Sequence, residues 1–289
     1  MRRRFGIFAS IAACTLCAVY GVAADLRVPP KVIAGRGFTV HADGRGDATF
    51  YLLGPANAIK RTIKLGSDLT IAPDDIANAG QYHAILCSSQ GCDAASFQVQ
   101  AGDPAHLSFF LHPSRVPVST PNSIDATAFV FDRYYNPVLD PEQVEFQISS
   151  GAGGNTARAI PTRRGVAWMR MGSSNQAGPV RIVASVADIQ EPRVIQQVAA
   201  EACSLRMKAT PNAKGALLET DPVRDCSGNP LPDGTIVSFT KTDSVGKTTV
   251  DAPIKKGVAR AQVDLKGHSQ ISVACGVVLG NEISVAGSM

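Results

Sequence analysis

The sequence lacks the excess of positive charge that proteins use to hold a polyanion. Its formal net charge is +4 over 289 residues, and three of its 28 Lys and Arg residues are Arg2, Arg3 and Arg4. The rest of the chain carries 25 Lys and Arg against 24 Asp and Glu. A nearly neutral surface does not attract a phosphate backbone or an anionic membrane. We therefore expect no nucleic-acid partner and no acidic lipid partner.

Beyond its first residues, the sequence also lacks any apolar run long enough to span a bilayer. The one long apolar stretch, residues 5–22, follows three arginines and ends in small residues before Asp25. This is the layout of a secretory signal, with cleavage expected after Ala24. In the alternative, a lipoprotein signal, Cys14 would become the lipid-anchored first residue. We expect residues 1–24 to be a signal peptide and the protein to be exported to the periplasm, the cell surface or the extracellular medium.

The sequence contains none of the short motifs that mark common catalytic sites. Gly-x-Ser-x-Gly, His-Glu-x-x-His and a phosphate-binding glycine loop are all missing. Among the five cysteines that follow residue 24, no pair has the CxxC spacing of a zinc or redox site. The histidines are dispersed along the chain: His41, His83, His106, His112 and His268. We expect no enzyme activity, no metal and no cofactor. A secreted hydrolase would require a nucleophile and base assembled wholly by folding.

No segment has the 3.6-residue apolar periodicity of an amphipathic helix. Short segments rich in Val, Ile, Thr and Phe are instead separated by Gly, Pro, Asn and Asp at intervals of about 8 to 12 residues, which is typical of β-sandwiches. Residues 258–265 alternate between a small apolar face and a mostly polar one, as a half-buried strand does. The pattern predicts an all-β protein, and the chain is long enough for two or three sandwiches.

The second part of the sequence repeats with an offset of 93 residues. Residues 132–140, Asp-Arg-Tyr-Tyr-Asn-Pro-Val-Leu-Asp, match residues 225–233, Asp-Cys-Ser-Gly-Asn-Pro-Leu-Pro-Asp. Further matches follow in the same order: Val144 and Phe146 with Val237 and Phe239, residues 163–167 with 255–259, and residues 183–185 with 273–275. In the Asn-Pro turn, proline fixes φ while Asp and Asn side chains bond to free backbone donors. The two segments are predicted to be copies of one sandwich.

This order of features resembles the group 1 bacterial immunoglobulin-like domains of invasin and intimin type proteins. The junction at residues 101–107, Ala-Gly-Asp-Pro-Ala-His-Leu, resembles the linker between such domains. The resemblance covers about residues 102–289 and implies tandem immunoglobulin-like sandwiches. Residues 79–82, Ala-Gly-Gln-Tyr, resemble the tyrosine corner of an immunoglobulin-like domain, although the usual cysteine two residues later is missing. After the signal peptide we therefore expect three immunoglobulin-like domains, at residues 25–101, 102–201 and 202–289.

Five cysteines follow the leader, and an odd count leaves at least one without an intramolecular partner. Cys87 and Cys92 flank a predicted hairpin loop and are expected to form a disulfide. In the last domain Cys226 and Cys275 are expected at one end of the sandwich, and their pairing is preferred. Cys203 begins the first strand near the same end. It competes for either partner or remains free.

Trp168 is a candidate for partner contact, because the repeat places it opposite Arg260 on the polar side of a strand. Partner contact, packing between domains and burial after a strand slip all remain open for this side chain. Tyr134 and Tyr135 replace Ser227 and Gly228 at the tip of the Asn-Pro turn. Their amphipathic rings suit a contact with a partner or packing against the adjacent domain.

Arg45-Gly46-Asp47 is the tripeptide that integrins bind in other proteins, here in a predicted turn. The ordinary alternative is a polar turn between two strands.

Together these features predict an exported, non-catalytic modular protein, a structural spacer with an adhesion-type role. It would present loop tips to a protein or glycan partner at the cell surface. The alternative is an accessory subunit or chaperone of an exported surface assembly that binds by β-strand addition.

Overall fold

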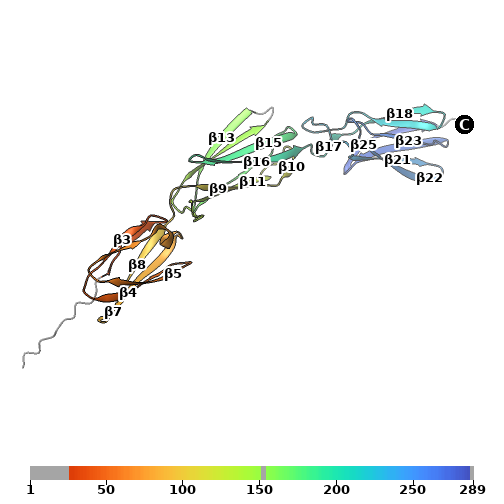
Figure 1. Cartoon of the computed structure of the whole chain (residues 1–289). Coiled ribbons are helices and arrows are strands. Elements are labelled where there is room, and N and C mark those ends of the chain that lie inside the picture. Colours follow the sequence, from red (N-terminus) through yellow and green to blue (C-terminus); the bar gives the residue numbers. More distant parts are fainter. Residues whose placement is uncertain (1–25, 151–153, 287–289) are drawn as a thin grey trace, which may run out of the picture. The chain divides into compact units, whose positions relative to one another are not determined.

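The protein is almost entirely β-strand, as the sequence predicts (Figure 1). The computed structural model describes residues 26–150 and 154–286, so the expected signal peptide and Cys14 lie outside the described residues. The chain divides into two compact units after Gly102. In the second unit, no described strand pairs across residues 199–201. We call residues 26–100 module 1, residues 106–198 module 2 and residues 202–286 module 3.

Module 1 consists of two sheets. The first has the order β1 (Leu26–Arg27), β3 (Phe38–Ala42), β6 (Asp68–Ile71), and the second has the order β2 (Lys31–Ile33), β8 (Gly91–Gln100), β7 (Gly80–Ser88), β4 (Asp47–Leu53), β5 (Ala58–Lys64). A short 3-10 helix, η1 (Pro73–Ile76), precedes β7. The buried Tyr82 donates its hydroxyl to the Asn78 carbonyl at 3.0 Å, which confirms the tyrosine corner.

Module 2 has the same two-layer arrangement. One sheet has the order β14 (Val166–Met171), β11 (Ile124–Phe131), β9 (His106–His112), and the other has the order β10 (Arg115–Pro117), β16 (Ile189–Val198), β15 (Gly178–Val186), β12 (Gln143–Ser150), β13 (Gly154–Pro161). Strand β10 runs parallel to β16, whereas the other pairs are antiparallel. In module 1, β2 is likewise parallel to β8.

Module 3 repeats this arrangement, but its larger sheet has one strand fewer than that of module 2. One sheet has the order β18 (Met207–Asn212), β19 (Gly215–Thr220), β23 (Arg260–Val263), and the other has the order β22 (Gly246–Pro253), β21 (Ile236–Asp243), β24 (His268–Cys275), β25 (Val278–Ala286). A short pair, β17 (Ala202–Ser204) and β20 (Arg224–Asp225), joins the start of the module to its Asn-Pro turn. No parallel strand borders β25 among the described residues.

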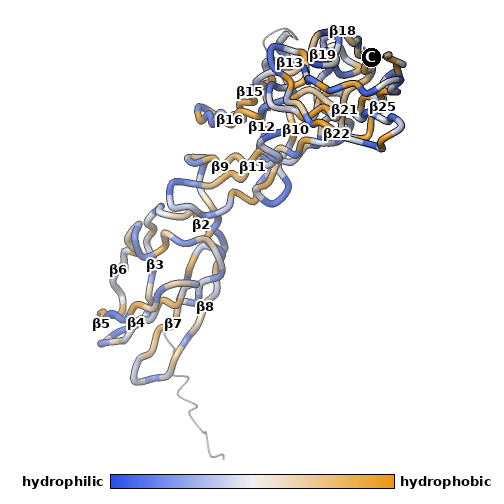
Figure 2. Tube along the Cα trace, turned by 90° about the vertical axis from the view of Figure 1, so that its right-hand side faces the viewer, coloured by the Kyte–Doolittle hydropathy of each residue, from blue (hydrophilic) through white to orange (hydrophobic). Residues whose placement is uncertain are grey.

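The cores form where alternating side chains of the two sheets meet. Hydrophobic residues are concentrated in the strands and hydrophilic residues in many of the turns (Figure 2). Phe146 and Phe239, matched by the repeat, are both fully buried. Burial of such a side chain contributes roughly 1.5–3 kcal/mol. The repeat therefore predicted the inward positions correctly.

The Asn-Pro turn has the same internal hydrogen bonds in both copies. Asp132 accepts from the backbone N–H groups of Tyr134 and Asn136 at 2.8 and 2.9 Å. Asp225 accepts from Ser227 and Asn229 in the same way, at 2.9 and 2.8 Å. The aspartate thus satisfies donors that the tight turn leaves without strand partners, as predicted.

One part of the predicted repeat is wrong by a residue. We matched Ala184 to Ala274, but Phe146 lies opposite Ala184 while its counterpart Phe239 lies opposite Val273. Ala184 therefore corresponds to Val273. The sequence similarity of two Val-Ala pairs suggested the other alignment, which would turn the whole strand by one side-chain position and expose its core residues.

The preferred disulfide of module 3 is also corrected. Cys203 pairs with Cys226, their Cα atoms 4.6 Å apart, and Cys275 is free and buried. Pairing of Ala202 with Asp225 and of Ser204 with Arg224 brings the first two cysteines together. Cys275 instead faces the core from β24. The disulfide between Cys87 and Cys92 forms as expected, across the β7–β8 hairpin.

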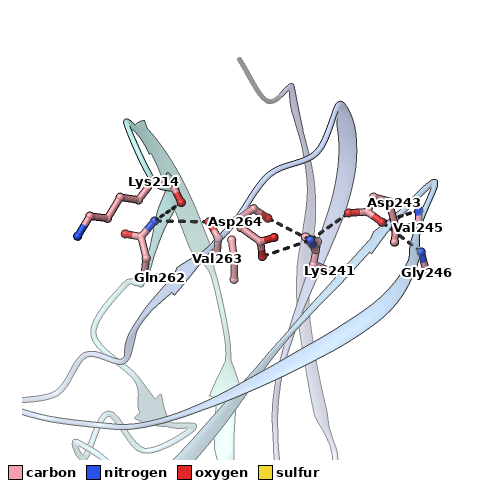
Figure 3. A network of polar contacts seen from close by, with 8 residues as sticks. All are labelled: Lys214, Lys241, Asp243, Val245, Gly246, Gln262, Val263 and Asp264. Atoms are coloured by element: carbon pink, nitrogen blue, oxygen red, sulfur yellow. Dashed lines mark hydrogen bonds and ion pairs between the residues drawn. The ribbon is translucent and has the colours of Figure 1, made fainter. Parts of the chain in front are cut away.

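One end of module 3 has a polar interior (Figure 3). Lys241, which occupies the position of Ile148 in module 2, is buried and donates to the Asp264 carbonyl at 3.0 Å. Its ammonium also lies 3.0 Å from Asp243 Oδ2. The hydrogen-bonded Asp243 carboxylate raises the pKa of Lys241, although burial alone would lower it. The charge is therefore retained inside the sheet layers because it is paired.

Candidate functional site

The outward face of the three-stranded sheet of module 2 carries the candidate site. In β11 and β14 the inward residues, including Ala126, Ala128, Ala167 and Met169, are buried. The alternate residues of β9, β11 and β14 therefore point away from the core. Among them are Phe110, Phe129 and Trp168, which we call the aromatic face, and Phe131, which lies at the end of β11 beside Tyr135.

The aromatic face forms a compact cluster around one threonine. Thr127 on the central strand lies opposite Phe110 on one side and Trp168 on the other. The Phe110 and Phe129 rings meet edge to face, with centroids 5.9 Å apart. Phe110 is 57% exposed and Trp168 is 52% exposed. The predicted outward orientation of Trp168 is confirmed, and burial after a strand slip is excluded.

An ion pair borders the aromatic face. Arg170 donates to both carboxylate oxygens of Asp125, at 2.7 and 3.0 Å. These hydrogen bonds hold the pKa of Asp125 below its usual range. The guanidinium carbon of Arg170 lies 5.4 Å from the centre of the Trp168 ring. The pair thus orients a cation beside the indole, at a surface that remains solvated.

The same three positions of module 3 carry charges. Lys208, Glu219 and Arg260 occupy the row that Phe110, Thr127 and Trp168 form in module 2. Lys208 Nζ lies 3.2 Å from Glu219, and Arg260 also pairs with this carboxylate. In module 1, the row Arg27, His41 and Asp68 on the corresponding sheet is also polar, with His41 hydrogen-bonded to Asp68 at 2.7 Å. Among these three rows, only that of module 2 exposes aromatic rings.

Phe110 and Phe129 were missed at the sequence level. Phe109 and Phe110 are consecutive, so one of the two must point outward from a strand. The sequence holds a signal that distinguishes them, because Leu107 and Pro113 match Leu205 and Pro211, 98 residues further on, and Phe110 then matches the polar Lys208. Phe129 required the strand register, which brings it diagonally beside Phe110.

Tyr134 and Tyr135 lie on the Asn-Pro turn of module 2, and the Tyr135 ring lies 6.5 Å from that of Phe131 at the end of β11. The Tyr135 ring stacks on the His106 ring with centroids 4.1 Å apart, and the side chain is 68% exposed. Tyr135 has φ of 63°, in the region that its counterpart Gly228 occupies with 86°. Stacking within the module gives Tyr135 a structural role. A partner contact for these two tyrosines stays a prediction.

Arg45, Gly46 and Asp47 lie where β3 is connected to β4, and all three are exposed. Gly46 has φ of 100°, and a side chain there would meet no atom within 4 Å. The tripeptide is thus on an open turn. Recognition by an integrin stays a prediction.

The turn of module 3 contacts module 2. Asn229 donates its side-chain amide to the Asn175 carbonyl at 2.9 Å and accepts from the Ala177 N–H at 2.9 Å. Ser119 and Ser227 hydroxyls are 2.8 Å apart. Asp225 also accepts from the N–H of Ala200 in the linker. The Asn-Pro turn therefore acts as a joint between modules 2 and 3, a role that the sequence did not indicate.

A cavity of about 400 Å³ lies beside this joint. Apolar side chains, including Pro117, Leu231 and Pro232, dominate its lining, and Cys275 borders it. Burial, with a smaller contribution from Glu201, raises the pKa of the Cys275 thiol. The thiol is therefore protonated at neutral pH and a poor nucleophile.

The described residues contain no group of three or more His, Cys, Asp or Glu side chains that could hold a metal ion. In the same part of the chain, no helix has the length and hydrophobicity needed to cross a membrane.

Comparison with solved structures finds a similar fold in several bacterial adhesins. The chain is similar to FdeC, a broadly conserved Escherichia coli adhesin, with a TM-score of 0.63 and 15% identity over 90% of this chain and 95% of that one. The chain has a tandem immunoglobulin-like β-sandwich fold. Invasin, a bacterial integrin-binding protein, gives 0.51 and 12% over 92% and 60% of the two chains. InvD of Yersinia pseudotuberculosis gives 0.51 and 10% over 92% and 98%.

No protein-family model and no curated protein sequence matches the chain. At these identities the similarity establishes the fold, and the function has to be argued from the surface.

Proposed function

We propose that this protein is an exported, non-catalytic adhesion protein that binds a protein or glycan at a cell surface through the aromatic face of module 2. The observation that supports this most directly is the exposure of Phe110 and Trp168 at positions where module 3 carries paired charges. Exposed aromatic rings on a rigid sheet are effective anchors, since little side-chain entropy is lost on binding. Domains at residues 25–101, 102–201 and 202–289 would provide the scaffold.

The remaining modules suit a spacer role. Hydrogen bonds between Asn229 and residues 175 and 177 tie module 3 to module 2. The outward rows of modules 1 and 3 satisfy their own charges. Such surfaces remain hydrated and do not compete with the aromatic face for a partner.

Binding of the mature, disulfide-bonded protein to epithelial cells tests the proposal. We expect Trp168→Ala and Phe110→Ala each to weaken binding at least tenfold, with thermal stability nearly unchanged because both side chains are exposed. Val194→Ala is the matched control, because Val194 is 58% exposed on the other sheet of module 2. Periodate treatment of the cells removes binding if the partner is a glycan, and protease treatment removes it if the partner is a protein.

Equal binding by the wild type and both aromatic variants would contradict the proposal. So would turnover of a substrate that a single point substitution abolishes, because that result would identify an enzyme.

A further inference from the structure

The edge of a sheet is closed differently in the three modules. In modules 1 and 2, the last strand of the larger sheet receives a short parallel strand, β2 beside β8 and β10 beside β16. Gln98 and Gln196 donate their backbone N–H groups to Pro30 and Ser114 respectively, both at 2.9 Å. These contacts cover only the last residues of the edge, Gln98–Gln100 in module 1 and Gln196–Val198 in module 2, which would otherwise present free backbone groups.

Module 3 lacks this closing strand because its first hairpin is shorter. In module 2, residues 113–123 lie between β9 and β11 and contain β10. In module 3, β18 is connected to β19 by residues 213 and 214 alone. Within the described residues this hairpin therefore supplies no strand beside the end of β25, and the backbone at Leu205 and Met207 approaches the start of β25. Among the described residues, β25 makes its backbone ladder only with β24.

In the second half of β25, every second residue directs its backbone N–H and C=O groups toward this open edge. Gln196 lies opposite Pro179 on β15, and it directs its N–H away from β15. The equivalent pair in module 3 is Ala286 and His268. Because strand geometry alternates, Ala286, Ser284 and Glu282 all direct their N–H and C=O groups outward. Asn281 bonds to the backbone of Met207 and covers only the start of the strand.

The other edge strands of the larger sheets carry residues that oppose pairing, and β25 has few of them. Strand β5 has Lys60, Arg61 and Lys64, while β13 and β22 both end in proline. Strand β16 has Pro192 at the position of Glu282. Lysines and prolines at edges prevent association with other strands. Strand β25 contains no proline and no basic residue, and its single charge is Glu282.

We propose that the open half of β25, from Glu282 to Ala286, pairs with the same strand of a second copy of this chain. An antiparallel pair centred on Ser284 sets Glu282 opposite Ala286 of the second copy, so the two carboxylates are separated. The outward-facing backbone groups of both strands then bond to one another. Ile283 and Val285 extend the apolar inner row of both sheets across the two-fold axis. A self-complementary contact of this kind closes as a dimer.

Sedimentation velocity of the mature, disulfide-bonded protein over a range of concentrations tests the pairing. We expect a concentration-dependent dimer, and Glu282→Pro should weaken its association at least tenfold. Module 2 tolerates proline at this edge position, so the variant should fold. Glu282→Gln is the matched control, because it retains the N–H and should leave dimerisation intact.

Cross-linking locates the contact independently. In a Cys275→Ala background, Ser284→Cys should give a covalent dimer with a short bismaleimide. Val194→Cys, at the equivalent position of the proline-containing edge of β16, should not. A chain that stays monomeric at all concentrations would overturn the proposal. A dimer that persists in Glu282→Pro and does not cross-link through residue 284 would also overturn it.

Discussion

The outward row of module 2 and the same row of module 3 differ in chemistry, while the residues on either side of each row point into the core in both modules. Phe110, Thr127 and Trp168 leave ring surface exposed, whereas Lys208, Glu219 and Arg260 satisfy one another. The inward residues are constrained by packing against the opposite sheet. Outward residues are not constrained by packing against the opposite sheet. The two sandwiches can therefore both keep a buried core while the outward face of module 2 acquires residues that can bind a partner. The comparison thus separates residues that maintain the fold from those that can serve a partner.

The largest expected effect tests whether the two cores are equivalent. Phe146→Ala and Phe239→Ala should each destabilise their own module by about 3–5 kcal/mol, because both remove a fully buried ring. Scanning calorimetry of the whole chain should show one transition moved to lower temperature in each variant. If one substitution lowers the free energy of unfolding of its module by less than about 1 kcal/mol, the two cores are not packed alike. The outward rows of the two modules could then not be treated as equivalent positions.

The second prediction compares the interactions that stabilise the first strand in modules 2 and 3. In module 3 the disulfide between Cys203 and Cys226 closes a separation of 23 residues, and Cys203→Ser should cost about 3 kcal/mol. In module 2 the corresponding end is held by the stack of Tyr135 on His106. Tyr135→Gly loses this stack but relieves the positive φ, so its net effect should be within about 1 kcal/mol. Urea unfolding of the two variants measures both effects.

Peptide mapping without reduction provides the control for the disulfide. Cys275→Ser should leave the Cys203–Cys226 peptide pair intact. A peptide that joins Cys226 to Cys275 in the wild type would contradict the structure.

The sequence predicted the structural features that depend on the repeat and on the residues of single turns. The Asn-Pro turn, the tyrosine corner and the outward position of Trp168 all follow from short-range pattern. The disulfide partner of Cys226 does not, since it depends on how β17 and β20 meet. The alignment of Ala184 failed for a related reason: only the neighbouring strand shows which residue faces Phe146. The open edge of β25 results from residues that module 3 does not have, and a residue-by-residue reading of the sequence does not reveal it.

An exchange of the outward rows of modules 2 and 3 tests directly whether the difference between these rows determines binding. Phe110→Lys, Thr127→Glu and Trp168→Arg together should reduce binding to cells at least tenfold while leaving the unfolding of module 2 almost unchanged. The reverse exchange, Lys208→Phe with Glu219→Thr and Arg260→Trp, gives module 3 the three residues of the aromatic row. Restoration of binding when the reverse exchange is added to the first would show that the row itself is sufficient. Failure to restore it would show that Phe129 or the Asp125–Arg170 pair is also required.

The smallest effect is the response of the charged row to acid. Hydrogen bonds from Arg260 first, and then from Lys208, hold the pKa of Glu219 below its ordinary value of 4.5. Glu219 therefore stabilises the fold above about pH 4.5, and this contribution is lost as the pH falls through its lower folded-state pKa. Glu219→Gln should slightly lower the stability of module 3 at neutral pH and flatten its decline in acid. Because Phe110, Thr127 and Trp168 do not titrate in this range, Thr127→Val should not change the acid response of module 2. Urea unfolding between pH 3 and pH 7 would contradict this view of the charged row if wild type and Glu219→Gln declined in parallel, since the carboxylate would then contribute nothing that protonation can remove.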